Sequence, residues 1–401
     1  MNDDTQATKK SKSETKQKIV IIGSGGHGVM SLSELLKHSQ YDHYVYFNTG
    51  DWGGSWGLWG RLLEYNNNEL NVLLHSQELD VLPFADLNKA ICHFVNLKNH
   101  QQEKIENLPS LDTKSVESVE FKDKSRRPRT ANKCVLDFRS DKTSDHQSKL
   151  LQIMKLVNFS IEEQQQFMDY FHTAWGFYQK NKSKLKYEKQ FCTGYVLQTF
   201  IYYKSAELAS CSDNLMNNRD VMYFWNKFWQ NLDILPGNVY LDFTSKNRQV
   251  MTARDLSLEK LFGEDQIDSY YSPILPETMF FENPDETLGK PKKPFIKILN
   301  QADLVIIPNG SVGNWLSVIN YQKVKSILKV KKIIWLTNPY RNKNELINPN
   351  YVLYFNECGI NVNTFVPAKN DQNAEYMNVL HQDKSGRYIP SQVADEILKM
   401  L

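Results

Sequence analysis

Cysteine is scarce in this chain. Its 401 residues include five cysteines, which are widely spaced and form no Cys-x-x-Cys pair. An odd, scattered set argues against a disulfide framework and against a thiolate zinc site. Long apolar runs are also missing, because no stretch approaches the roughly 18 residues that a membrane-spanning helix needs. We therefore expect a protein of a reducing, cytoplasmic setting that has no membrane partner.

A strong excess of charge of either sign is absent as well. The formal net charge of +2 is too small to predict nucleic-acid binding from electrostatics alone. Residues 1–17 are polar and lysine-rich without an apolar core, so we interpret them as a disordered leader and not as a secretory signal. The whole chain is 41% hydrophobic and 23% charged, which is typical of globular proteins.

Two glycine-rich loops stand out, and each follows a short apolar strand near opposite ends of the chain. The first extends from Ile19 to Gly28 and the second from Asp303 to Asn314. A strand that ends in glycines and then begins a helix directs backbone N–H groups at one spot, which favours an anion and usually a phosphate. Two such loops predict a phosphate-bearing ligand in the crevice of an open α/β sheet. The alternative is that both loops are tight turns without a ligand.

Strands alternate with helical stretches along much of the chain. This order predicts an α/β, Rossmann-like, doubly wound and mostly parallel sheet with a helical insertion. We expect residues 18–97 to form the first half of the nucleotide-binding core and residues 191–401 the second half. Residues 98–190 are expected to form a loop plus the helical insertion, in which Ser160 and Glu163 have the spacing of a capping box.

The first loop has the spacing Gly23-x-Gly25-x-x-Gly28, which fits a dinucleotide-binding fingerprint. A nicotinamide-dependent dehydrogenase would also place an acid at the tip of the second strand, to hold the ribose. Asn48 occupies that tip, which disfavours a dehydrogenase without excluding it. Asp51 lies in the glycine loop that follows, and Asp86 lies where a later helix is expected to begin. Together these carboxylates could hold a magnesium ion against a diphosphate, although Asp86 alone is more simply a helix cap.

The order of these segments resembles the 2-phospho-L-lactate transferase (CofD) superfamily, which includes the YvcK-type gluconeogenesis factors. The first strand-loop-helix, the Asn48–Ser55 turn, the Pro83–Phe94 segment, and the late loop that ends in Pro308-Asn309-Gly310-Ser311 follow one another as in that family. Thr193-Gly194-Tyr195 resembles the start of a helix in the middle of the family's chain. The resemblance covers about 18–97 and 191–401.

The resemblance implies a nucleotide at the switch point of a Rossmann-like fold and assigns roles by position. Asp51 and Asp86 would be catalytic acids and magnesium ligands. The expected nucleotide-binding residues are Gly23, Ser24, Gly25, Gly26, His27, Asn48, Thr49, Asn309, Gly310 and Ser311. The expected partner is a nucleoside diphosphate or a nucleotide-linked small molecule, and a homo-oligomer is compatible with the sequence.

The chain also departs from the family's pattern. Trp52 follows Asp51 where the family often has a second acid, and Asn88 replaces a second acid after Asp86. Two functions therefore remain open. One is a magnesium-assisted transferase that acts on a nucleoside-diphosphate-linked donor, and the other is a non-enzymatic nucleotide-sugar-binding regulator.

Overall fold

The computed structural model describes residues 16–47, 90–92, 136, 138–181, 191–210, 225, 227–228, 238–240, 250–262, 267, 274–282, 288–338, 348–367, 378–382 and 387–401. Within them, seven strands form one sheet in the order β12-β11-β10-β9-β1-β2-β5, and every neighbouring pair is parallel. The strands are β1 (Gln17–Ser24), β2 (Tyr41–Phe47), β5 (Asn238–Tyr240), β9 (Leu304–Ile307), β10 (Ile333–Leu336), β11 (Asn363–Pro367) and β12 (Asn378–Leu380).

This strand order confirms the predicted fold class. Counted along the chain within the sheet, the strands are arranged 3-2-1-4-5-6, the order of the Rossmann fold, with a seventh parallel strand added at the edge. The order reverses between β1 and β9, where Ile19 lies opposite Leu304 and Ile21 opposite Ile306. That reversal is the topological switch point of the sheet.

Alternate residues of β1 face two different cores, because successive side chains of a strand point to opposite faces. Ile19 and Ile21 pack in one cluster with the helical elements that follow β1 and with the last helix. Val20 and Ile22 pack in the other cluster, on the opposite face. All four are fully buried, as expected for a sheet covered on both sides.

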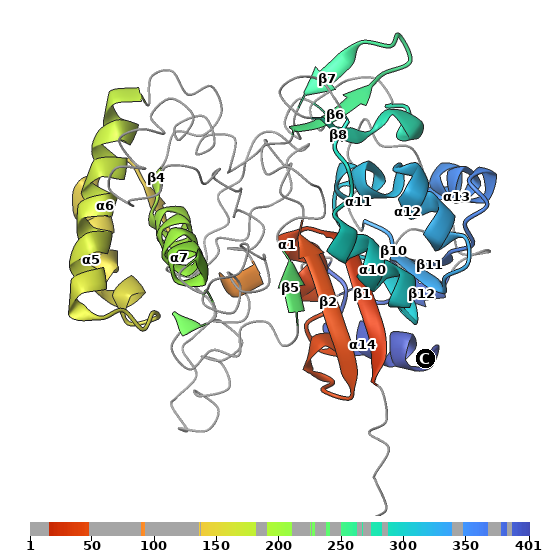
Figure 1. Ribbon diagram of the computed structural model, residues 1–401, viewed down its shortest axis with the longest axis horizontal. Helices are drawn as coiled ribbons and strands as arrows, with labels where there is room; N and C mark the ends of the chain where they lie inside the picture. Colours follow the sequence, from red (N-terminus) through yellow and green to blue (C-terminus); the bar gives the residue numbers. More distant parts are fainter. Residues whose placement is uncertain are drawn as a thin grey trace, which may run out of the picture.

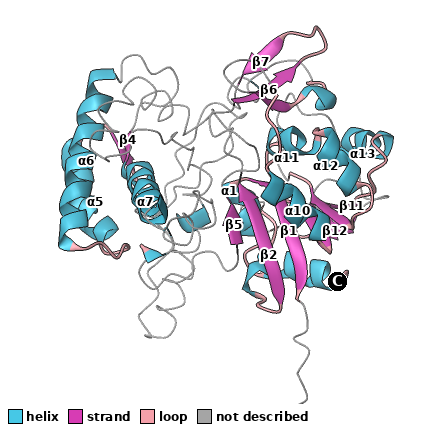
Figure 2. Cartoon of the chain, viewed as in Figure 1, coloured by secondary structure: helices cyan, strands magenta, loops and turns pink. Residues whose placement is uncertain are grey.

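The helices cover the two faces as a doubly wound sheet requires (Figures 1 and 2). The elements on the face of Ile19 are α1 (Gly26–Ser31), η1 (Leu35–Lys37) and α14 (Pro390–Leu398). The elements on the face of Val20 are α10 (Lys293–Gln301), α11 (Val312–Ile319), α12 (Gln322–Leu328) and α13 (Asn348–Glu357).

A helical unit stands to one side of the sheet (Figure 1). Its elements are β3 (Arg139–Ser140), α5 (Thr143–Met154), α6 (Ile161–Asn181), β4 (Phe191–Cys192) and α7 (Thr193–Ser210). The predicted capping box starts α6: the Ser160 amide donates to Glu163 Oε2 over 2.8 Å, and the Glu163 amide donates to Ser160 Oγ over 3.2 Å. Phe200 of α7 packs against Phe167 of α6, with ring centroids 5.4 Å apart, so α7 belongs to the packed helical unit.

A small antiparallel sheet lies over α11 (Figure 1). Its strands are β6 (Val250–Arg254), β7 (Lys260–Phe262) and β8 (Phe280–Glu282), and η4 (Pro276–Thr278) precedes β8. Asn320 at the end of α11 fixes this sheet, because its Nδ2 donates to the carbonyls of Pro276 and Met279 over 2.6 and 2.8 Å. The Tyr354 hydroxyl of α13 in turn donates to Asn320 Oδ1.

Candidate functional site

The candidate site lies where β1 and β9 end side by side. In parallel α/β sheets, ligands bind outside the carboxyl ends of the strands at the switch point. The first glycine loop leaves β1 at this edge and the second leaves β9 at the same edge, since the two strands are parallel neighbours in register. The structure therefore brings together two loops that are separated by most of the chain.

Gly23 brings the first loop close to the beginning of α11. Its φ is +66°, in the left-handed region that favours glycine. A Cβ at Gly23 would collide with the carbonyl oxygen of Asn314 and would lie 2.7 Å from Trp315 Cα. The end of β1 and the first turn of α11 thus meet backbone to backbone, which only a glycine allows.

Gly28 makes the reciprocal contact between α1 and the second loop. A Cβ at Gly28 would lie 2.7 Å from Pro308 Cβ and 3.0 Å from the carbonyl oxygen of Asn309. The glycine pattern in the first loop therefore serves close packing against the second loop. The two loops form one continuous surface at the switch point.

Two helices begin at this surface, and neither beginning is capped by a side chain. Gly25 is the N-cap of α1 and Ser311 is the N-cap of α11. The first N–H groups of a helix have no acceptor within the helix, and the helix dipole makes this end favourable for an anion. The arrangement is suited to holding the oxygens of a phosphate or diphosphate.

The second loop is polar, buried and adjacent to open space. Asn309, Ser311 and Asn314 are all buried. Asn309 Oδ1 has no hydrogen-bond partner in the part of the chain that the structure describes. Among the described residues, the atom nearest to a Cβ at Gly310 is Asn314 Nδ2, at 3.9 Å, so these residues leave room on that side of the loop.

The small sheet closes over the first turn of α11. A Cβ at Gly313 would lie 2.5 Å from Met251 Sδ, and Met251 is fully buried on β6. The late loop is therefore packed between β1 beneath and β6 above. Such packing holds the loop in one conformation before a ligand arrives, which lowers the entropy lost on binding.

The predicted site residues fall into two groups. The structure brings together Gly23, Gly25, Gly26 and His27 from the first loop with Asn309, Gly310 and Ser311 from the second, and Ser24 ends β1 between them. Asn48, Thr49, Asp51 and Asp86 lie outside the described residues. No cluster of three or more histidine, cysteine or acidic side chains occurs among the described residues, so magnesium stays a prediction.

Sequence reasoning passed over Thr337 and Asn338. They follow β10, which pairs with β9, and so lie at the same edge of the sheet as the second loop. Thr337 is fully buried, and its backbone carbonyl oxygen accepts a hydrogen bond from the Tyr388 hydroxyl over 3.0 Å. A polar pair directly after four buried strand residues is a signal that could have placed Asn338 at the edge of the crevice.

A second polar cluster lies in the helical unit and has a structural role. His146 Nε2 donates to the carbonyl of Ser140 over 2.9 Å, so its Nδ1 accepts the Thr193 hydroxyl over 2.6 Å. Burial is the main cause that lowers the pKa of His146, so the ring is neutral at pH 7. Both side chains are fully buried. A substrate cannot reach the hydroxyl, and the cluster ties α5 to the start of α7.

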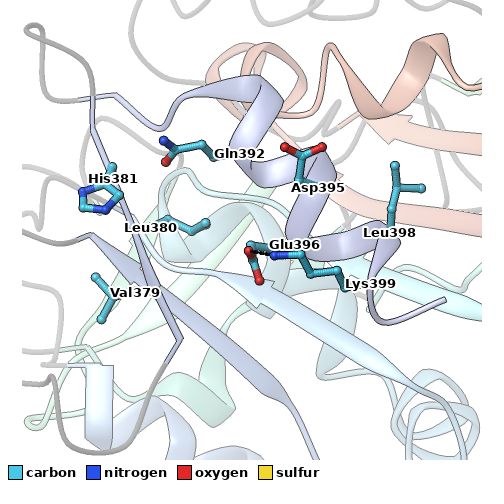
Figure 3. Close-up of a pocket in the computed structure, with 8 residues that line it drawn as sticks. All are labelled: Val379, Leu380, His381, Gln392, Asp395, Glu396, Leu398 and Lys399. Atoms are coloured by element: carbon cyan, nitrogen blue, oxygen red, sulfur yellow. Dashed lines mark hydrogen bonds and ion pairs between the residues drawn. The ribbon is translucent and has the colours of Figure 1, made fainter.

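A hollow formed by described residues lies elsewhere in the fold. It has a volume of about 730 Å³ and lies between β12 and α14, where His381, Asp395, Glu396 and Lys399 line it (Figure 3). β12 is four strands from β1 in the sheet, a distance of roughly 19 Å. On the wall of this hollow, Lys399 Nζ forms an ion pair with Glu396 Oε1 at 2.5 Å, three positions earlier in the chain. This hollow is therefore separate from the glycine loops.

The fold and the paired loops define an open, doubly wound α/β protein whose two glycine loops meet at its switch point. No protein-family model matches the chain, and no curated protein matches it in sequence. It is similar to the 2.60 Å crystal structure of a UPF0052 family protein from Bacillus halodurans. The TM-score is 0.53 and the identity 14%, over 96% of this chain and 99% of that chain. This likeness establishes a shared fold. None of the described helices is long and apolar enough to cross a membrane.

Proposed function

We propose that this protein binds a nucleoside-diphosphate-linked ligand at the switch point and acts as a transferase similar to 2-phospho-L-lactate transferase. The observation that carries the proposal is the contact between the two glycine loops, in which Gly23 meets α11 and Gly28 meets Pro308. Two helix starts without a side-chain cap then lie at the same edge of the sheet, an arrangement that suits a diphosphate. The fold neighbour supports the same family at a coarse level, because UPF0052 is the CofD/YvcK family.

The proposed chemistry needs orientation and charge neutralisation more than covalent help. An acceptor hydroxyl attacks phosphorus in the donor, the new O–P bond forms, and the P–O bond to the nucleoside monophosphate breaks. Asp51 or Asp86 would take the proton of the hydroxyl. The same carboxylates are the proposed ligands of magnesium, which when bound would neutralise diphosphate charge.

A sequence observation favours a second candidate, a non-enzymatic nucleotide-sugar-binding regulator of carbon or cell-envelope metabolism. Trp52 and Asn88 stand at positions where a second acid would accompany Asp51 and Asp86. A site with fewer carboxylates retains phosphate binding through backbone groups and loses metal affinity. Binding without turnover is the expected behaviour of such a protein.

The first test is thermal stabilisation by GDP, UDP, UDP-sugars and NAD, each with and without magnesium. A ligand present at a hundred times its dissociation constant stabilises the folded state by about 2.7 kcal/mol. Stabilisation by a nucleoside diphosphate supports the proposal, and stabilisation by NAD alone would support a dehydrogenase. Gly310→Val would fill the open side of the second loop and should remove the ligand's effect. A normal response of Gly310→Val would show that the loop is only a turn.

A further experiment separates the transferase from the regulator. The donor that stabilises the protein is incubated with magnesium and candidate acceptor alcohols, and release of nucleoside monophosphate is measured. Asp51→Asn should abolish release and weaken the magnesium-dependent part of binding. Binding that is strong, independent of magnesium and without release would favour the regulator.

A further inference from the structure

Asn309 carries a buried carboxamide whose burial the described fold does not explain. Its side chain is only 6% exposed, and Oδ1 has no hydrogen-bond partner among the described residues. Buried amide groups nearly always have a partner, because loss of hydration without a replacement bond destabilises the folded state. A partner that binds from outside the chain would supply the missing bond.

The position of Asn309 indicates what that partner is. The residue lies two positions after the end of β9, at the switch point next to β1. Its own carbonyl oxygen is only 3.0 Å from the Cβ position of Gly28, so α1 holds its backbone in place. Gly310, the next residue, borders open space, and α11 begins two residues after that. The unpartnered oxygen is therefore part of the loop that would contact the ligand.

We propose that Asn309 is a specificity-determining residue, whose carboxamide oxygen accepts a hydrogen bond from an O–H or N–H group of the ligand next to its phosphates. This inference rests on the proposed function. Ionised phosphate oxygens are acceptors only, so they cannot satisfy a carboxamide oxygen, whereas the backbone N–H groups of the helix starts can satisfy them. The site therefore selects a diphosphate that carries a hydroxylated or amino-bearing group over a bare diphosphate.

Discrimination follows from the same unpaired atom. A ligand that lacks the donor would leave Oδ1 buried without a partner, and buried polar mismatches are rejected more strongly than missing methylene groups. The donor can belong to the nucleoside or to the group linked to it. Both sources share one chemistry, and a series of ligands of decreasing size separates them.

The experiment compares the full-length protein with Asn309→Leu, which keeps a similar shape and removes all hydrogen bonding. Affinities for UDP-glucose, UDP and inorganic pyrophosphate are measured by calorimetry. We expect Asn309→Leu to lower the affinity for UDP-glucose about 10- to 100-fold, while the affinity for pyrophosphate changes less than about twofold. If only the affinity for UDP-glucose falls, the hydrogen-bond donor belongs to the linked group. If the affinity for UDP falls equally, the donor belongs to the nucleoside. Asn300→Leu is the matched control, because Asn300 is exposed in the last turn of α10, before β9 begins and away from the carboxyl end of that strand.

Equal weakening of all three ligands, or of none, would overturn the proposal. A second readout is independent of ligand identity. Because Oδ1 is unpartnered, Asn309→Leu and the smaller Asn309→Ala should not both lower the melting temperature of the free protein. A clear fall in both would show that the carboxamide is bonded within the fold, and the proposal would fail. If the unmodified protein binds none of these probes and is not stabilised by GDP either, while the melting temperatures behave as expected, the proposed function fails along with this inference. The melting result alone then shows that the amide is unpartnered.

Discussion

Replacement of Gly23 by alanine should disrupt the junction on which the crevice depends. Gly23 has φ +66°, and a left-handed conformation costs an L-residue with a side chain about 1–2 kcal/mol. The new methyl group would also lie 2.7 Å from Trp315 Cα and 2.9 Å from the carbonyl carbon of Asn314. These are backbone atoms, which cannot rotate away, and overpacking of this kind costs about 1–3 kcal/mol. We therefore expect a loss of about 2–5 kcal/mol in the free energy of unfolding.

The assay is urea unfolding followed by tryptophan fluorescence, because Trp315 and Trp335 are buried beside this junction. The midpoint should fall for Gly23→Ala. Gly176→Ala is the matched control: Gly176 lies within α6 with no atom within 4 Å of its Cβ position, so alanine should stabilise by about 0.5–1 kcal/mol. If both variants unfold at the same urea concentration as the unmodified protein, the close backbone contact at Gly23 is refuted.

Three more perturbations test other parts of the structure. Gly194→Ala would place Cβ 2.7 Å from the Leu136 carbonyl carbon, so the melting temperature should fall by an amount equivalent to about 1–3 kcal/mol; an unchanged value would contradict the contact. Asn320→Leu removes the hydrogen bonds to the carbonyls of Pro276 and Met279, and we expect faster proteolysis of the small sheet, at a cost of roughly 1–3 kcal/mol; unchanged proteolysis would show that Asn320 does not anchor it. Burial, followed by the nearby His38, lowers the pKa of His43 from 6.5 to about 4. The unfolded chain then binds more protons between these values, so stability is full above pH 6.5 and falls by at most about 3 kcal/mol toward pH 4. His43→Leu should flatten this dependence in urea midpoints taken at pH 7 and pH 4.5, and equal losses in both proteins would exclude His43 as the cause.

The parts of the fold that the sequence predicts are those with strong local signals. Ile19–Ile22 and Leu304–Ile307 are continuous apolar runs bounded by glycines, and both are central strands. The capping-box spacing of Ser160 and Glu163 predicts the start of α6. The stretch from Val312 to Leu328 forms two helices and not one, because Asn320 ends α11 and turns its side chain to the small sheet. That break depends on a partner more than 40 residues away, which local periodicity cannot reveal.

The small antiparallel sheet was not predicted at all. Val250–Arg254 is short and mixes apolar with polar residues, and its exposed turn contains leucine rather than glycine or asparagine. Leu258 adopts φ +63°, and Asp255 holds this turn by accepting the amides of Ser257 and Glu259. Asp255 and Ser257 are common turn residues, but a leucine occupies the left-handed position where glycine or asparagine is usual, so the sequence lacks the usual hairpin signal.

The candidate site was predictable in its loops and not in its contacts. Glycine spacing indicates a helix start after a strand, and this pointed to Gly25 and Ser311 from the sequence alone. That Gly28 packs against Pro308 follows only from the pairing of β1 with β9, because no periodic signal links positions so distant. The buried oxygen of Asn309 likewise becomes visible only when its surroundings are known.

The pairing of β1 with β9 also sets the order in which the molecule can mature on the ribosome. The amide of Lys18 in β1 donates to the side chain of Asp303, which directly precedes β9 and lies 285 positions later. At about 5–20 residues per second, roughly 15–60 s pass between synthesis of the two strands. During that interval the apolar strand β1 has an open edge where β9 will later bind, an edge of the kind that recruits chaperones or foreign strands. The nascent chain therefore passes through a vulnerable period whose length is fixed by the position of the second loop.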